Sequence, residues 1–204
     1  RADLDAYLCR HGMGYTIIES AKNGLSARQE TFVPISDNCE LTRITLRNDA
    51  QSEKTVDLFS CVEFCLWNAL DDMSNFQRNY NIGEVEVEGG RIYHKSEYRE
   101  RRNHFAVFAV NAPVAGFDTD RTAFLGEYRG FDSPRAVEEG VSRQSIAHGW
   151  QPIGSHHLRL TLAPGETKRF IFTLGYCENP QDEKFIAPNV INKAPAYRLL
   201  EKYM

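Results

Sequence analysis

Residues 55–88 read TVDLFSCVEFCLWNALDDMSNFQRNYNIGEVEVE, and this stretch decides the fold. From Val56 to Leu66 an apolar or small side chain stands at every second position, which is the period of a strand with one buried face. The alternation stops after Trp67 and returns at Glu84, where glutamates and valines alternate strictly. The stretch therefore predicts two strands that hold a long polar loop between them.

The predicted loop combines hydrogen-bonding side chains with two aromatic rings, those of Trp67 and Phe76. Donors and acceptors beside flat apolar faces suit a sugar better than an ion or a lipid. An ordered loop that only caps the end of a sheet can have the same composition, so spacing alone leaves that alternative open. The polar side chains are Asn68, Asp71, Asp72, Asn75, Gln77, Arg78 and Asn79.

Turn signals divide the rest of the chain into further short strands. Asn23-Gly24 and Gly89-Gly90 each join two strand-like runs and predict β-hairpins. Residues 104–111 are apolar on both faces, so we expect a central strand that is covered on both sides. Many strands with almost no internal helix predict an all-β fold, an antiparallel β-sandwich with long loops. The predicted strands are residues 5–10, 14–19, 25–33, 41–47, 55–66, 84–88, 91–95, 104–111, 157–162 and 170–176.

The C-terminal half of the sequence predicts an excursion, a hairpin and a short helix. Residues 112–155 lack a long regular run and predict an extended ordered segment over the sheet, of a kind that is usually functional or interfacial. The turn at 163–166 predicts that the strands on either side of it pair with each other. From Asn192, a candidate N-cap, apolar residues at helical spacing predict a helix that is cut after Met204, so we expect a piece of a longer polypeptide. These apolar residues are Ala196, Leu199, Leu200 and Tyr203.

Composition and charge argue against several classes of protein. Lys plus Arg number 24 against 28 for Asp plus Glu, so the chain lacks the basic excess with which a general nucleic-acid binder neutralises phosphates. No apolar run approaches the ~20 residues of a membrane span. The cysteines show neither metal-binding nor CxxC spacing, and we expect buried free thiols in a reducing, cytoplasmic compartment. They are Cys9, Cys39, Cys61, Cys65 and Cys177, of which Cys61 and Cys65 are expected on one face of one strand.

Three further groups of residues invite a site but have simpler explanations. The charge run at 97–102 could hold a phosphate, although mixed charges more often form a solvated edge. His156 and His157 are adjacent on a predicted strand and point to opposite faces, so they cannot share a metal with His148. Asp71 and Asp72 could include a general acid, but neighbouring loop carboxylates more often serve turns. The residues alone therefore predict no reaction and no metal or cofactor site.

Four strings nevertheless match a known family. They are residues 10–16 (RHGMGYT), 67–79 (WNALDDMSNFQRN), 93–104 (YHKSEYRERRNH) and 147–153 (AHGWQPI). Together they resemble the amino-terminal region of the inverting cellobiose phosphorylases, in glycoside hydrolase family 94. The resemblance implies a galactose-mutarotase-like β-supersandwich over residues 1–190 and the start of a linker helix over 191–204. The family's catalytic (α/α)6 barrel would then lie outside this chain.

The resemblance also implies an activity for the parent protein. Enzymes of this family use inorganic phosphate as a co-substrate, and no cofactor, to cleave cellobiose into α-glucose 1-phosphate and glucose. Phosphate takes the place of water, so one general acid, an aspartate on the barrel, suffices. The loop is expected to reach over the barrel and line the acceptor-sugar site. Its expected substrate-binding residues are Asn68, Asn75, Gln77 and Arg78, and no catalytic residue is expected in this chain, which should be inactive alone.

The expected partners are a disaccharide or glucose, the barrel of the parent chain, and a second copy of that chain in a homodimer. Two other functions are consistent with the residues: a stand-alone carbohydrate-binding module, and a structural or dimerisation domain that braces a barrel. Chitobiose and cellodextrin phosphorylases share the family's architecture, so the exact disaccharide stays open. Whether the loop serves its own subunit or a neighbour stays open as well.

Overall fold

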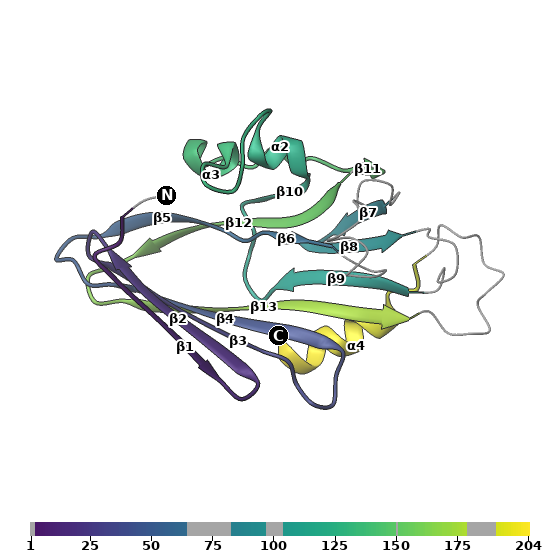
Figure 1. The fold of residues 1–204 in the computed structure, drawn as a ribbon, viewed down its shortest axis with the longest axis horizontal. Coiled ribbons are helices and arrows are strands. Elements are labelled where there is room, and N and C mark those ends of the chain that lie inside the picture. The colour runs from purple at the N-terminus through teal and green to yellow at the C-terminus, as the bar shows by residue number, and fades with distance from the viewer. Residues whose placement is uncertain (1–2, 65–82, 97–103, 150, 179–190) are drawn as a thin grey trace.

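Two antiparallel β-sheets stack face to face, as the sequence predicts (Figure 1). The structure, a computed structural model, describes residues 3–64, 83–96, 104–149, 151–178 and 191–204. Within these residues one sheet has nine strands and the other four. In Figure 1 the smaller sheet lies above the larger, with α2 and α3 above it and α4 below the larger sheet. The all-β sandwich with a short C-terminal helix is therefore confirmed.

The larger sheet contains strands from both ends of the chain. In spatial order it consists of β1 (Ala6–Gly12), β2 (Tyr15–Lys22), β3 (Leu25–Phe32), β4 (Cys39–Asn48), β13 (Thr167–Glu178), β9 (His104–Val110), β8 (Arg91–Ser96), β7 (Gly83–Glu88) and β11 (His148–Gly149). The smaller sheet consists of β10 (Gly116–Asp120), β12 (Pro152–Leu162) and β5 (Lys54–Phe59), with β6 (Val62–Glu63) also paired to β12. The helices are α2 (Arg121–Leu125), α3 (Arg135–Glu139) and α4 (Ala194–Tyr203).

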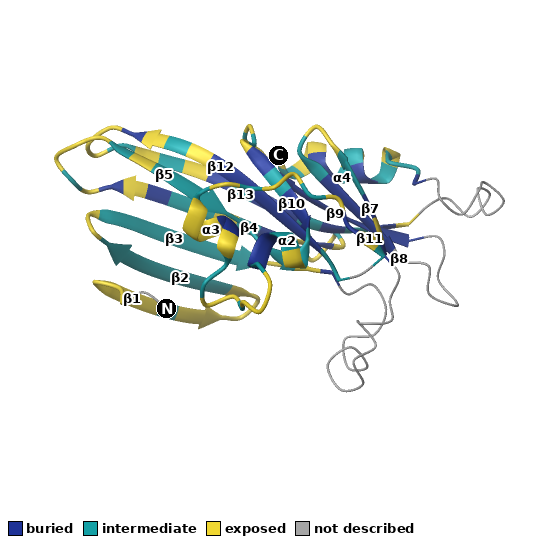
Figure 2. Ribbon diagram, turned by 90° about the horizontal axis from the view of Figure 1, so that it is seen from above, coloured by how far each residue is buried: buried dark blue, intermediate teal, exposed yellow. Residues whose placement is uncertain are grey.

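Strand β9 lies at the centre of the fold, as predicted from its sequence, which is apolar on both faces of the strand. All its residues are buried, and it pairs with β13 on one side and β8 on the other. Phe108 faces the core between the sheets, whereas Phe105 and Val107 face the opposite side, where α4 covers them. Burial follows this arrangement in Figure 2, where β9 is buried and β1 is exposed. The two faces of one strand therefore serve two separate apolar clusters.

The predicted hairpin between residues 157–162 and 170–176 is wrong. Strand β12 pairs with β5 and β10, whereas β13 pairs with β4 and β9 in the other sheet. The turn between them carries the chain from one layer to the other, and Leu158 and Phe172 meet the same core from opposite sides. Fully buried Asn48 anchors this crossing by donating to the carbonyls of Ser52 and Leu162, at 2.8 and 3.0 Å. Alternation reveals a buried face but does not identify the neighbouring strand.

Two other predicted elements are also corrected. The strand predicted over 55–66 is interrupted after Phe59, where Ser60 exchanges hydrogen bonds with the backbone of His156, so Cys61 does not lie in a strand. Cys65 lies outside the described residues. The segment predicted to be irregular, 112–155, contains β10, α2, α3, β11 and the start of β12. These elements are at most five residues long within the segment, too short to show a period in the sequence.

Helix α4 lies where the sequence predicts it, and ion pairs stabilise both of its ends. Its N-cap position is Lys193 rather than Asn192, although the Asn192 side chain still accepts a hydrogen bond from the Ala194 amide. Lys193 pairs with Glu86 and Glu88 of β7, at 2.9 and 2.5 Å. None of the helices in the described part of the chain is long and apolar enough to span a membrane.

Candidate functional site

The predicted sugar-binding residues Asn68, Asn75, Gln77 and Arg78 lie outside the described residues. The same holds for Asp71-Asp72 and for the charge run at 97–102. The described residues on either side of the loop nevertheless define where it joins the sandwich. Phe64 follows β6 in the smaller sheet, and Gly83 begins β7 in the larger one. The loop is therefore attached to both layers.

Strand register brings three undescribed segments to the same end of the larger sheet. Gly83 pairs with Ser96 across β7 and β8, and His104 pairs with Glu178 across β9 and β13. His148 of β11 pairs with Glu84 beside them. In Figure 1 these strand ends lie together on the right. The segments 65–82, 97–103 and 179–190 therefore all attach at this end, which we call the loop end.

Aromatic and imidazole rings gather at the loop end. The ring of Phe64 stacks on His94 with centroids 4.6 Å apart and planes 16° apart. His104 stacks on Tyr176 with centroids 5.7 Å apart. Burial, with a smaller contribution from His104, lowers the pKa of His94 to about 3, so this imidazole is neutral at physiological pH. Phe64 and His94 are 8% and 4% exposed, so their stack is part of the core packing at this end of the sheet.

A charged pair lies at the same end of the larger sheet but on its other face, because Lys95 directly follows His94 in β8. Lys95 is only 6% exposed and pairs with Glu84 at 2.9 Å, across the first rungs of β7 and β8. A buried ammonium of this kind is tolerated because a carboxylate partner offsets its lost hydration. The two faces of the larger sheet at the loop end therefore differ, with a ring stack on one and an ion pair on the other.

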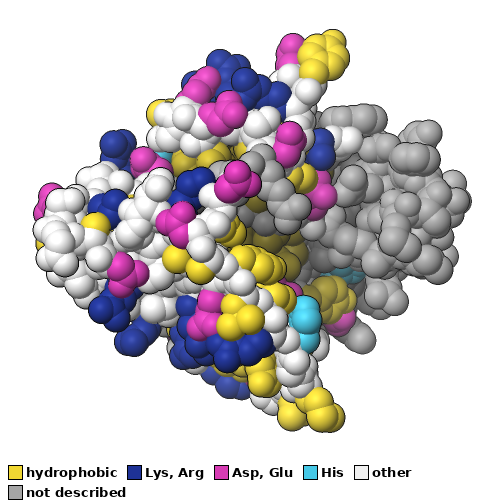
Figure 3. All heavy atoms as spheres, turned by 60° about the vertical axis from the view of Figure 1, so that its left-hand side comes forward, with side chains coloured by type: hydrophobic (Ala, Val, Ile, Leu, Met, Phe, Trp, Pro, Cys, Tyr) yellow, Lys and Arg dark blue, Asp and Glu magenta, His cyan; other side chains and the backbone are white. Residues whose placement is uncertain are grey.

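A groove of about 740 Å³ opens beside Phe64 on the inner side of the larger sheet. Its floor is apolar, and Figure 3 shows hydrophobic side chains inside a hollow between the two layers. Carboxylates and an amide line it, because Asp37, Asn38 and Glu40 lie in or just after the turn that follows β3, and Glu63 lies in β6. Such a lining can stack on a sugar ring and bind its hydroxyl groups.

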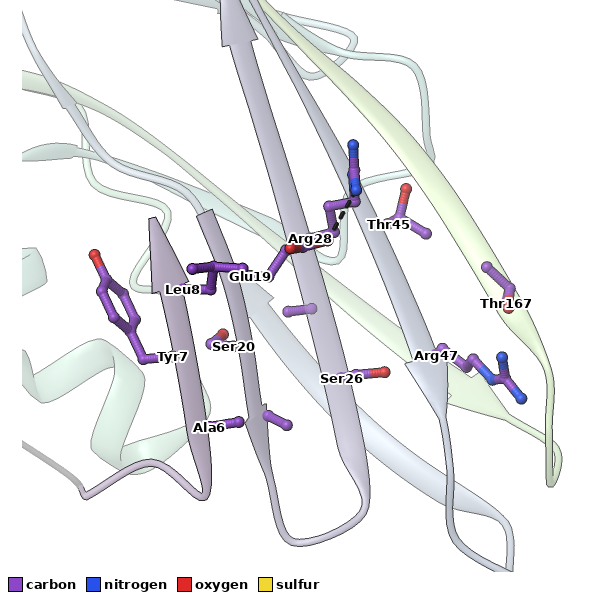
Figure 4. Close-up of a pocket in the computed structure, with 12 residues that line it drawn as sticks. Ala6, Tyr7, Leu8, Glu19, Ser20, Ser26, Arg28, Thr45, Arg47 and Thr167 are labelled. Atoms are coloured by element: carbon purple, nitrogen blue, oxygen red, sulfur yellow. Dashed lines mark hydrogen bonds and ion pairs between the residues drawn. The ribbon is translucent and has the colours of Figure 1, made fainter. Parts of the chain in front are cut away.

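A second depression, of about 460 Å³, lies over the first strands of the larger sheet (Figure 4). Its most prominent cation, Arg28, pairs with Glu19 and with Glu30, each at 2.8 Å. These pairs lower the pKa of both carboxyls, and Arg10 has the largest such effect on Glu19. We interpret this surface as a network of ion pairs and do not include it in the candidate site.

The side chains of His156 and His157 point to opposite faces of β12, as predicted. The His156 ring lies in the core, packed near Phe108 and Phe172, and bonds the carbonyl of Gly90 at 2.8 Å. His157 stacks on Phe59 instead and bonds Asp57 at 2.7 Å. Across the described ranges, no three His, Cys, Asp or Glu side chains lie close enough together to hold a metal ion.

Sequence reasoning missed the inward-facing rings at the loop end. His94, His104 and Tyr176 were not selected, although each stands at an inward position of a predicted strand. The available signal was the alternation itself, since polar rings at core-facing positions near a strand end are unusual. Register between β8, β9 and β13 brings them together, and this register is not visible in any single strand.

Comparison with known proteins identifies a family that this chain matches. The family model described as "Glycosyl hydrolase 94, supersandwich domain" matches residues 1–204. An N,N'-diacetylchitobiose phosphorylase from Vibrio proteolyticus is 31% identical over 174 residues, which is 85% of this chain and 22% of that protein. A solabiose phosphorylase from Paenibacillus borealis is 29% identical over 206 residues, which is 98% of this chain and 27% of that protein. The chain thus spans about a quarter of the length of these relatives.

A solved structure supports the fold. A putative kojibiose phosphorylase from the human microbiome superposes with a TM-score of 0.52 over 92% of this chain and 20% of that chain, at 11% sequence identity. At this identity the similarity concerns the architecture of the sandwich only.

Proposed function

Because this chain belongs to the glycosyl hydrolase 94 supersandwich-domain family, we propose that it is the sandwich domain of an inverting disaccharide phosphorylase, with its loop 65–82 in the acceptor-sugar site. The observation that supports a role in sugar binding is the convergence at the loop end. Three segments attach there, beside the Phe64–His94 stack and the apolar-floored groove. An apolar groove with a few polar groups at its rim is the usual form of a small-molecule site.

The proposed reaction is phosphorolysis. A phosphate oxygen forms a bond to the anomeric carbon of the non-reducing sugar while the glycosidic bond breaks, and a general acid gives its proton to the leaving oxygen. The configuration at the anomeric carbon inverts, so a β-linked disaccharide gives an α-sugar 1-phosphate and a free sugar. We assign the acid and the phosphate pocket to the barrel of the parent chain, and this domain to one wall of the acceptor site.

We propose cellobiose as the substrate to test first, with N,N'-diacetylchitobiose and solabiose as the alternatives that the names of the relatives suggest. We further propose that the parent is a homodimer in the cytoplasm. The four described cysteines are unpaired thiols, which supports a reducing compartment. Burial raises the pKa of Cys61 to about 12 and that of Cys177 to about 11, so these two thiols stay protonated.

The test of the acceptor-site role uses the parent enzyme in the synthetic direction. Asn75→Ala, Gln77→Ala and Arg78→Ala should each raise KM for the acceptor sugar and leave KM for the sugar 1-phosphate within about twofold. If all three variants keep the wild-type acceptor KM, the loop does not line the acceptor site. The chain would then be a structural domain that braces the barrel.

A further inference from the structure

The imidazole of His94 contacts the residues on both sides of the loop 65–82. On one side lies Phe64, whose ring stacks on it with centroids 4.6 Å apart. On the other side lies Gly83, which is buried. A Cβ atom at Gly83 would clash with Cε1 of His94 and would lie 3.1 Å from its Nδ1, so the imidazole packs directly on the Gly83 backbone. One side chain therefore joins both attachment points of the loop.

His94 is itself fixed by the centre of the fold. Its backbone pairs with Val85 of β7 and with Ala106 of β9, and the residue is 4% exposed. The tip of the Phe64 ring lies against Gly154 of β12, where a Cβ atom would lie 3.0 Å from Cζ of Phe64. The row Gly154–Phe64–His94–Gly83 thus crosses from the smaller sheet to the larger one.

The contacts of His94 depend on its shape. Its Nδ1 is buried and has no hydrogen-bond partner among the described residues, and burial keeps the ring neutral. Packing on a glycine backbone on one side and stacking on a phenyl ring on the other require a flat, rigid side chain. An aliphatic residue of similar volume fills the space without the stack.

We infer that His94 is a positioning residue, which holds both ends of the loop 65–82 in register with the two sheets and thereby places the side chains that the loop offers to the sugar. The second half of this inference rests on the function proposed above. The first half concerns described residues only and is testable without any activity.

The test compares His94→Leu with His156→Leu in the 204-residue chain. The residues are matched, because both are buried imidazoles that pack on a phenylalanine ring, at 4% and 0% exposure. At pH 7, hydrogen exchange at the amides of residues 83–85 should be at least about tenfold faster in His94→Leu than in the unmodified chain, because local opening costs less free energy there. In His156→Leu, exchange at these amides should be unchanged. Phe64→Leu, which removes the other ring of the stack, should reproduce the effect. Equal exchange in all three variants would overturn the inference.

Kinetics in the parent enzyme separate this inference from the proposed function. His94→Leu should raise KM for the acceptor sugar about tenfold with KM for phosphate within about twofold, whereas His156→Leu should change neither. If the loop variants raise the acceptor KM but His94→Leu behaves like His156→Leu, the inference fails and the proposed function stands. If no loop variant affects the acceptor and His94→Leu still accelerates exchange at 83–85, the proposed function fails and His94 keeps only its role in fixing the loop ends.

Discussion

Asp37 and Lys202 are 165 residues apart in sequence and form an ion pair that ties the end of α4 to the turn between β3 and β4. Tyr203 donates a hydrogen bond to the same carboxylate. Because this turn is also one wall of the groove beside Phe64, the position of α4 and the shape of the groove are linked. The Lys202 and Tyr203 hydrogen bonds hold the pKa of Asp37 at about 2.

This depressed pKa predicts a pH dependence of α4 docking. A carboxyl whose pKa is lower in the folded state stabilises that state above its ordinary pKa of 3.8, and the contribution disappears as the pH falls through about 2. Asp37→Asn should therefore accelerate hydrogen exchange in α4 relative to the unmodified chain at pH 7. The difference should vanish near pH 2. A difference that is independent of pH would mean that Asp37 acts through packing and not through its charge.

Gly83 should tolerate no side chain. A Cβ atom there would lie 2.7 Å from Cγ of Pro152, in addition to its clash with His94. Gly83→Ala should lower the free energy of unfolding by about 1–3 kcal/mol, as overpacking of a core does. The matched control is Gly130→Ala, whose nearest neighbour is the end of the Asp132 side chain, and which should stay within about 0.5 kcal/mol. Urea unfolding measures both, and equal effects would contradict the packing described at the loop end.

Two buried histidines should make the fold sensitive to mild acid. Burial lowers the pKa of His156 to about 4 and that of His94 to about 3, from an ordinary value of 6.5. Since the unfolded chain binds these protons first, the stability they contribute is complete above pH 6.5 and is lost as the pH falls toward 4 and below. The free energy of unfolding, measured from pH 7 to pH 4, should fall less steeply in His156→Leu than in the unmodified chain. Parallel slopes would show that His156 does not titrate on unfolding.

The sequence predicted most strands because alternation and turn residues are local signals. Strand β9 was predicted to be central because it is apolar on both faces, and the structure buries both. The pairing of β12 was wrong because the turn at Pro164-Gly165 resembles a hairpin turn, whereas its strands separate into different sheets. No feature of the turn sequence itself distinguishes a hairpin from a turn that crosses between two sheets. Here the fully buried Asn48, far away in sequence, fixes the crossing.

The candidate site could be predicted only in part, because alternation is a local signal and the contacts between strands are not. The polar loop was visible as a break in the alternation after Trp67, and its outline as a sugar-facing segment came from composition. His94 and Gly83, which we propose to fix the ends of this segment, belong to strands whose register is set across the sheet. Their proximity to Phe64 depends on the stacking of two sheets, which a strand-by-strand interpretation does not provide.

Arg78 should contribute to acceptor binding in the parent enzyme. A guanidinium can bind two sugar oxygens at once, and hydrogen bonds to a charged group contribute roughly 1.5–3 kcal/mol each. Arg78→Ala should therefore lower the efficiency of the synthetic direction by about ten- to a hundredfold when the acceptor is varied, with the melting temperature nearly unchanged. Arg159→Ala, on an arginine whose side chain is 64% exposed, is the matched control and should have no effect on either quantity. A collapse in melting temperature with unchanged acceptor constants would assign Arg78 a structural role instead.

We propose that this chain is one domain of a phosphorylase and supplies no catalytic group of its own. The most direct test is the release of sugar 1-phosphate from cellobiose, N,N'-diacetylchitobiose and solabiose, with and without inorganic phosphate, by the parent protein and by the 204-residue chain. We expect α-sugar 1-phosphate from at least one disaccharide, only with the parent protein and only when phosphate is present. Phosphate-independent hydrolysis by the parent protein, or turnover by the isolated chain, would contradict it.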